Sequence, residues 1–451
     1  MNYENSEKLK SMKILIRQKT FDIQYMRRRV ESILALFMIH CIRHSLIFSS
    51  FMLISSISQA QVLRLDSVIQ VIKERNPMLQ DFRHRTNAMN AYSAGAKSWM
   101  APEVGGGLWM VPYKKVEDVR DKGQIMLSVQ QKFTHPTKLK ASKEYMESKS
   151  AIEIQGELIA YNELRSQAKA AYYQWIVLEK KKKVIQVNEG IIKLMINIAK
   201  LRNPHDQSNI GNVYKAEGRL YEVKNMMLMN ENEIHVKRTI INQLMNIPID
   251  SYFEIDTLNS LPAFVYQNVD TSLFISSRSD IRRIDKRIQS MKLNQVLERQ
   301  QTKPDFNLSF NHMIPRGAGM PSQFMLLGML SIPIAPWSSK MYKSNVLGME
   351  LEIKAMRSER ESILNELHGM TIAMISEIQM LLKQIENFDK HILPALHRNY
   401  ESTMLAYEEN EEELPMVINA WEALNMTQMQ YLDTLQKYYN MIVNYEKQIE
   451  K

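Results

Sequence analysis

The sequence has little of what several common fold classes require. Its single cysteine, Cys41, excludes a disulfide-stapled scaffold and any zinc or iron–sulfur site built from cysteines. Glycine and proline number 14 each, which is about 3% of the chain apiece and below the usual ~7% and ~5%. This scarcity excludes a collagen-like or Pro/Gly-rich disordered chain and argues against an all-β sandwich. No apolar run of about 18 residues occurs beyond residue 60, which excludes a multi-pass helical membrane protein.

The net charge of +9 is unevenly distributed. Residues 1–60 carry nine basic and four acidic residues, so the rest of the chain has a net charge of only +4, with both signs interspersed. No basic helix, zinc finger or aromatic RNA-binding surface accompanies this charge. We therefore expect no nucleic-acid partner.

The N-terminal region contains an apolar stretch of secretory-signal length at residues 45–58. Arg43 stands before it, and Ser58-Gln59-Ala60 places small residues at the two positions that set cleavage. A membrane anchor is the alternative, but the stretch is short for a span. We expect residues 38–60 to be a signal peptide, cleaved after Ala60.

Residues 1–37 are unusual in front of an export signal, because they are long and broken into basic patches. They represent an over-extended start if translation begins at Met26 or Met38, and the sequence leaves this choice open. Cleavage after Ala60 would give a mature chain without cysteine.

The remainder of the chain contains an internal repeat with an offset of 202 residues. The positions that correspond at this offset include Leu79 and Ile281, Pro102 and Pro304, and Ala171 and Ala373. We expect two tandem copies of one design, residues 61–262 and residues 263–451.

Each copy is predicted to contain a helix, two short strands and two long helices, in that order. The predicted elements of the first copy are 65–101, 104–111, 124–132, 138–200 and 212–246. Those of the second copy are 271–302, 305–313, 323–333, 339–407 and 415–449. A helix of about 60 residues is ~90 Å long, far beyond the mean helix of ~11 residues. The fold class is α+β and mainly α, and it is not a compact globule.

The first long helix of the second copy, predicted at 339–407, shows how such helices would pack. Its apolar residues recur three and four apart, which is the spacing of a coiled-coil seam. These residues are Ile363, Leu367, Met370, Met374, Ile378, Leu381, Ile385, Phe388 and Ile392. Pro394 is expected to kink or locally open this helix.

The predicted strands alternate between apolar and small polar residues, clearly so at 305–311. This pattern suits a transmembrane β-strand with lipid on one side and water on the other. A small soluble hairpin packed on a helix is the alternative, and the export signal favours the membrane. The predicted lipid-facing residues are Trp109, Ile125, Leu127, Val129, Phe306, Leu308 and Phe310.

The number of strands then constrains the assembly. Four strands cannot close a barrel, because the smallest membrane barrels have about eight. Open strand edges are not tolerated in lipid. If these strands span a membrane, the chain must oligomerise.

From about residue 63 to its end, the chain resembles the TolC-type outer-membrane efflux proteins, the outer membrane factors of tripartite export systems. The residues that carry the resemblance are Leu65-Asp66-Ser67-Val68-Ile69, Asn76-Pro77-x-Leu79, Leu127-Ser128-Val129 and Leu330-Ser331-Ile332-Pro333. The resemblance implies a homotrimer whose strands form one 12-stranded β-barrel in the outer membrane, continued by a long α-helical tunnel through the periplasm. It also implies a passive exit duct, without a cofactor, that docks with a periplasmic adaptor and an inner-membrane pump.

The resemblance places the turns between the long helices at the periplasmic tips of the tunnel, where the adaptor would bind. The first turn, residues 201–211, contains Arg202 and Asn203. The second lacks the Gly and Ser that the family usually carries there, so the usual tip contacts with an adaptor are not expected. It carries five carboxylates instead, which would either attract cations or form a solvated acidic turn. They are Glu408, Glu409, Glu411, Glu412 and Glu413.

No catalytic or phosphate-binding motif is present, so we expect no enzyme activity. The 32 methionines favour core packing, with soft-metal efflux as a minor alternative. The rival to an export duct is a structural coiled-coil protein of the periplasm or cell surface whose hairpins never enter a membrane.

Overall fold

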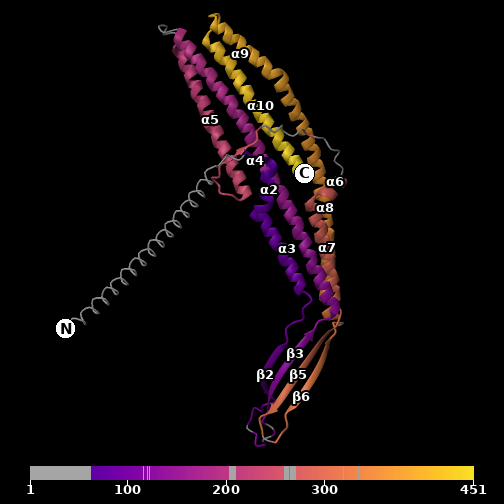
Figure 1. Ribbon diagram of the computed structural model, residues 1–451. Coiled ribbons are helices and arrows are strands. Elements are labelled where there is room, and N and C mark those ends of the chain that lie inside the picture. Colours follow the sequence, from indigo (N-terminus) through magenta and orange to yellow (C-terminus); the bar gives the residue numbers. More distant parts are fainter. Residues whose placement is uncertain are drawn as a thin grey trace, which may run out of the picture. The chain divides into compact units, whose positions relative to one another are not determined.

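The computed structural model describes residues 62–114, 116–118, 120, 122–202, 210–257, 264, 271–317, 319–333 and 335–450 (Figure 1). The expected signal peptide and the segment before it lie outside these residues. The described residues from Leu63 onward belong to one structural unit.

The described elements follow the predicted order of helix, two strands and two long helices, and they do so twice. The first series comprises β1 (Val62–Leu63), α2 (Leu65–Arg75), α3 (Pro77–Gly95), β2 (Glu103–Trp109), β3 (Gln124–Phe133), α4 (Pro136–Arg202), α5 (Ile210–Met245) and β4 (Glu254–Ile255). The second comprises α6 (Thr271–Ser277), α7 (Ser279–Gln300), β5 (Asp305–Pro315), β6 (Gln323–Ser331), α8 (Pro336–Asn387), η2 (Phe388–Ile392), α9 (Leu393–Glu408) and α10 (Leu414–Gln448).

Helix α4 is the central element of the helical part. It has 67 residues, and its only proline is Pro136 at the first position, where the missing N–H has no helical partner to lose. Near the strands, α4 packs between α3 and α7, and α8 packs on α7. Further from the strands, α4 packs between α5 and α10, and α9 packs on α10. The helices therefore form a layer with α4 inside it.

The helix predicted at 65–101 differs from the structure in two respects, because the chain breaks it at Asn76 and α3 ends at Gly95. Proline disfavours helical geometry in the residue before it, and Asn76 is extended ahead of Pro77. Its side chain accepts a hydrogen bond from the Met78 N–H at 2.9 Å and donates one to the Leu244 carbonyl at 2.9 Å. Asn76 therefore ends α2 and caps α3.

The helix predicted at 271–302 is also divided, at Arg278. The Glu450 carboxylate accepts hydrogen bonds from the Ser279 N–H at 2.8 Å and from the Ser279 hydroxyl at 2.7 Å. A carboxylate at this position satisfies a free amide and complements the helix dipole. The start of α7 is thus set by a residue 171 positions away along the chain.

The expected disturbance near Pro394 is confirmed. Helix α8 passes into a π-helical turn at Phe388–Ile392 before α9 begins. Proline cannot donate the hydrogen bond that the α-helix requires, and the Leu393 N–H bonds to the Phe388 carbonyl, five residues back. The wider turn absorbs the missing bond, so the helix continues.

The four longer strands form one antiparallel sheet in the order β2-β3-β5-β6 (Figure 1). Val129 faces Phe310 across β3 and β5, and Phe310 faces Leu326 across β5 and β6. Strands β1 and β4 form a separate two-stranded ladder. Among the described residues, no helix is both long enough and apolar enough to cross a membrane.

Candidate functional site

One face of the four-stranded sheet is apolar and exposed. Residues paired across antiparallel strands share a face, so the register places Ile125, Leu127 and Val129 of β3 on the face of Phe306, Leu308 and Phe310 of β5. All except the half-buried Leu308 are exposed, with Leu127 at 50%. Strand β6 adds Phe324, whose ring stacks on Phe310 with centroids 6.0 Å apart. Six of the seven residues predicted to face lipid therefore lie together.

Trp109 is the exception, and its predicted position is wrong. It pairs with Gln124, whereas the preceding Leu108 pairs with Ile125. Successive residues of a strand point to opposite faces, so Trp109 lies on the face opposite Ile125. We therefore leave it out of the apolar face.

The opposite face carries mainly polar and flexible side chains. Ser128 pairs with Asn311, and Gln130 pairs with Ser309. The Asn311 amide donates a hydrogen bond to the Ser309 hydroxyl at 3.1 Å. The two faces thus have the asymmetry of a strand that separates an apolar medium from water.

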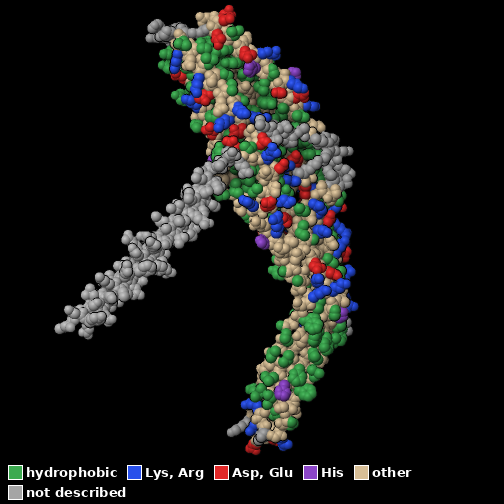
Figure 2. Space-filling view, in the orientation of Figure 1, with side chains coloured by type: hydrophobic (Ala, Val, Ile, Leu, Met, Phe, Trp, Pro, Cys, Tyr) green, Lys and Arg blue, Asp and Glu red, His purple; other side chains and the backbone are tan. Residues whose placement is uncertain are grey.

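The sheet also contains a band without carboxylate, lysine or arginine side chains, in which His312 is the one titratable base. Its segments 104–109, 124–131, 306–315 and 323–331 contain no Asp, Glu, Lys or Arg. Figure 2 shows hydrophobic side chains gathered over the strands, whereas charged side chains cover the helices and reappear at the hairpin ends. A charge-free band between two charged regions has the arrangement expected of a membrane-spanning sheet.

Aromatic residues mark the end of the sheet nearest the helices. Trp99 lies edge-on to Phe133 with ring centroids 5.1 Å apart, and Phe133 lies 6.0 Å from Phe306. Trp99 itself is largely exposed. Aromatic rings gather in this way at the interfaces of membrane barrels.

The sheet has two unpaired edges. Within the described residues, β2 pairs only with β3, and β6 pairs only with β5. Every residue of both edge strands is exposed. The charge-free β6 has none of the charges or prolines by which proteins usually protect an edge from association.

The predicted acidic cluster forms the turn between α9 and α10. Glu408 ends α9 and Glu413 precedes α10, and all five carboxylates are exposed. Asn410 takes the left-handed conformation that the tight turn needs, with φ of 69°. The structure brings the five side chains into a single turn.

The other predicted tip is described only in part. Arg202 is the last residue of α4, and Asn203 lies outside the described residues. Apolar residues of α4, α5, α9 and α10 form one buried cluster near both turns. The two helical hairpins therefore end side by side (Figure 1).

The half-buried Tyr173 of α4 and the buried Tyr439 of α10 pack together where these two helices meet. The rings of Tyr173 and Tyr439 lie 5.8 Å apart. Burial is the main cause that raises the pKa of Tyr173 from 10.0 to about 12, and the Glu446 charge adds to it. Burial also raises the pKa of Tyr439. Nearby, the hydrogen bond from Lys447 lowers the pKa of Glu163.

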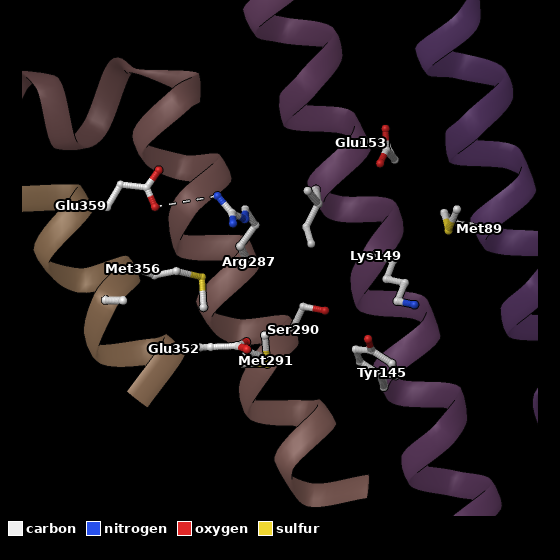
Figure 3. Close-up of a pocket in the computed structure, with 12 residues that line it drawn as sticks. Met89, Tyr145, Lys149, Glu153, Arg287, Ser290, Met291, Glu352, Met356 and Glu359 are labelled. Carbon is white, nitrogen blue, oxygen red and sulfur yellow. Dashed lines mark ion pairs between the residues drawn. The ribbon is translucent and has the colours of Figure 1, made fainter. Parts of the chain in front are cut away.

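A groove of about 720 Å³, which no sequence pattern indicated, is lined jointly by α3, α4, α7 and α8 (Figure 3). Its residues come from both halves of the chain, and no local motif marks them. Among the described residues, no group of three or more His, Cys, Asp or Glu is placed to hold a metal ion.

Comparison with solved structures identifies the fold. The outer-membrane channel OprN matches with a TM-score of 0.69 at 14% identity, over 85% of this chain and 89% of OprN. The outer membrane protein VceC of Vibrio cholerae matches with a TM-score of 0.66 at 13% identity, over 85% of this chain and 95% of VceC. The open MtrE channel of Neisseria gonorrhoeae matches with a TM-score of 0.68 at 14% identity, over 86% of this chain and 88% of MtrE.

No protein-family model matches the sequence, and no curated protein matches it either. The chain has the fold of these outer-membrane channel proteins. The resemblance seen in the sequence is thus confirmed at the level of the fold.

Proposed function

We propose that this protein is a passive exit duct in the outer membrane of a Gram-negative-type cell, extending into the periplasm. The observation that carries the proposal is the four-stranded sheet, which combines an exposed apolar face, a charge-free band and two unpaired edges on a channel fold. These features serve no purpose in a soluble rod, whereas a membrane barrel requires the first two and its assembly requires the third.

The duct is a homotrimer. Three chains would supply twelve strands, and β6 of one chain would pair with β2 of the next. Twelve strands leave room for a water-filled interior. The apolar face then contacts lipid, and the polar face with Ser309 and Asn311 lines the channel. The long helices would continue the barrel as a periplasmic tunnel.

Export explains the N-terminal sequence. Residues 38–60 would direct the chain across the inner membrane and be removed after Ala60. Two repeats, residues 61–262 and 263–451, then build the wall of the duct, each supplying two strands and two long helices.

The two helical hairpins would form the periplasmic end, where an adaptor joins the duct to an inner-membrane pump. Arg202 and Asn203 in one turn and the acidic cluster Glu408–Glu413 in the other would meet that adaptor. The five carboxylates of each chain would also favour cations at the tunnel entrance.

The protein acts without catalysis, as its channel-like neighbours suggest. The rival function, a structural coiled-coil rod of the periplasm or cell surface, requires the strands to remain in water. The exposed Phe306, Phe310 and Phe324 argue against this.

Conductance in planar lipid bilayers tests the proposal. Purified full-length protein in detergent should insert and produce stable, water-filled channels of uniform size. Protein heated until its trimers separate serves as the control and should give none. An intact oligomer that never conducts would contradict the duct.

A further inference from the structure

The groove between α3, α4, α7 and α8 has the size of a small-molecule site. Its volume of about 720 Å³ lies within the range of ~300–1,000 Å³ usual for such pockets. Side chains of all four neighbouring helices line it. In the proposed ring of chains, the groove would open to the channel if this side of the helix layer faces inward.

Charge defines what the groove can hold. Arg287 pairs with Glu359, with Nη1 and Oε2 3.9 Å apart (Figure 3). Glu153 of α4 and Glu352 of α8 have neither an ion-pair nor a hydrogen-bond partner among the described residues, and they lie on opposite sides of the groove (Figure 3). The charged lining consists of three carboxylates and two cations, Lys149 and Arg287. Its net negative charge favours a positively charged ligand.

Apart from Ser290, the remaining lining is mainly apolar and adaptable. Met89, Ile152, Met291 and Met356 contribute hydrocarbon and thioether surface, and methionine adjusts its shape to different partners. Tyr145 offers a ring face that already attracts a cation, with the Lys149 ammonium 4.5 Å from its centroid. The groove therefore combines negative charge, aromatic surface and apolar surface.

We infer that this groove binds lipophilic organic cations as they pass through the duct. The inference rests on the proposed function, and it assigns the protein a class of cargo. Glu153 and Glu352 would hold the positive charge, and the methionines and Tyr145 would contact the apolar body. Three such grooves would line each channel.

Equilibrium dialysis of purified full-length protein in detergent tests the inference. Tetraphenylphosphonium is the probe, and tetraphenylborate, of nearly the same size and opposite charge, is its control; protein-free detergent supplies the background. The phosphonium should bind saturably and the borate should not. Binding of both ions alike, or saturable binding of neither, would overturn the inference.

Paired substitutions locate the binding. The double variant E153Q/E352Q should weaken phosphonium binding about tenfold, because each exposed charge pair contributes up to ~1 kcal/mol. Glu361→Gln is the matched control, since nine residues along α8 place it on the opposite side of the helix from Glu352, and it should bind like the wild type. Unchanged affinity in the double variant would overturn the assignment.

The same samples separate this inference from the proposed function. A trimeric, conducting wild-type protein that does not bind the phosphonium would refute the cation groove and leave the duct standing. A protein that is neither trimeric nor conducting would refute the duct, and the groove as a cargo site with it.

Discussion

Tyr173 and Tyr439 show how packing between the long helices favours the protonated form of a phenol. Their rings pack together where α4 meets α10, and burial disfavours the ionised phenolate. Burial is also the largest cause of the raised pKa of Tyr173, about 12 against 10.0 for a free phenol. A proton held more tightly in the folded state links stability to pH.

This linkage predicts a loss of stability in alkali. The contribution of Tyr173 is fully present below pH 10, where the unfolded chain is also protonated. It decreases as pH rises from about 10 to about 12, because only the unfolded state then gains by ionising. Melting temperatures from circular dichroism should fall over this interval, and less steeply in Tyr173→Phe. The exposed Tyr92 is the control, and Tyr92→Phe should follow the wild-type profile; an equal slope in all three proteins would contradict the prediction.

A second prediction concerns the two faces of β3. Val129 lies on the apolar face and Gln130 on the polar face. A lysine in contact with lipid costs about 2–4 kcal/mol near the membrane centre, whereas a lysine in a water-filled channel stays hydrated. Val129→Lys should therefore lower the amount of folded protein in outer membranes much more than Gln130→Lys. Immunoblots of membrane fractions measure this, and equal yields would contradict the assigned faces.

Among the secondary-structure elements, the two edge strands of the sheet indicate that the chain assembles with other copies. Strands β2 and β6 are exposed along their whole length and have no second neighbour among the described residues. They are the two opposite edges of the same sheet. Strand β6 of one chain can therefore pair with β2 of the next chain. Such head-to-tail pairing closes a ring when the rotation between neighbours allows it.

Disulfide cross-linking tests this pairing in a mature chain that would lack cysteine. A cysteine at Val104 in β2 is combined in turn with one at Leu326, Gly328 or Leu330 in β6. At least one combination should give covalent dimers and trimers on a non-reducing gel. Each single-cysteine variant is the control, and the absence of intersubunit products from every combination would contradict the edge pairing.

The elements also show what could be predicted from the sequence. The strands predicted at 104–111, 124–132, 305–313 and 323–333 lie within a few residues of those observed, because alternation of side chains is a local signal. The division at Arg278 was missed because Glu450, remote in sequence, supplies the contact. The face on which Trp109 lies was not predicted, because it depends on how β2 pairs with β3, and the sequence of β2 alone does not contain this pairing. The groove required four helices, and periodicity along one of them cannot reveal it.

At the scale of the whole molecule, the five carboxylates of the α9–α10 turn acquire a role only through assembly. A trimer would gather fifteen of them around one end of the tunnel. One turn in isolation would be a solvated acidic loop. Charges focused at a narrow opening favour ions of opposite sign, and salt screens the effect.

Selectivity measurements test this role. Replacing Glu408, Glu409, Glu411, Glu412 and Glu413 with glutamine should reduce cation preference in single-channel recordings, and most strongly at low salt. The conductance should remain, since the barrel is unchanged. Unaltered selectivity at low salt would show that the turn is only solvated.

The central claim is that three chains form one channel in the outer membrane. The most direct measurement is the mass of the protein extracted in detergent from purified outer membranes, by light scattering with the detergent subtracted. The account predicts three copies of a chain that has lost its first 60 residues. A monomer, or protein found only in the soluble periplasmic fraction, would contradict it.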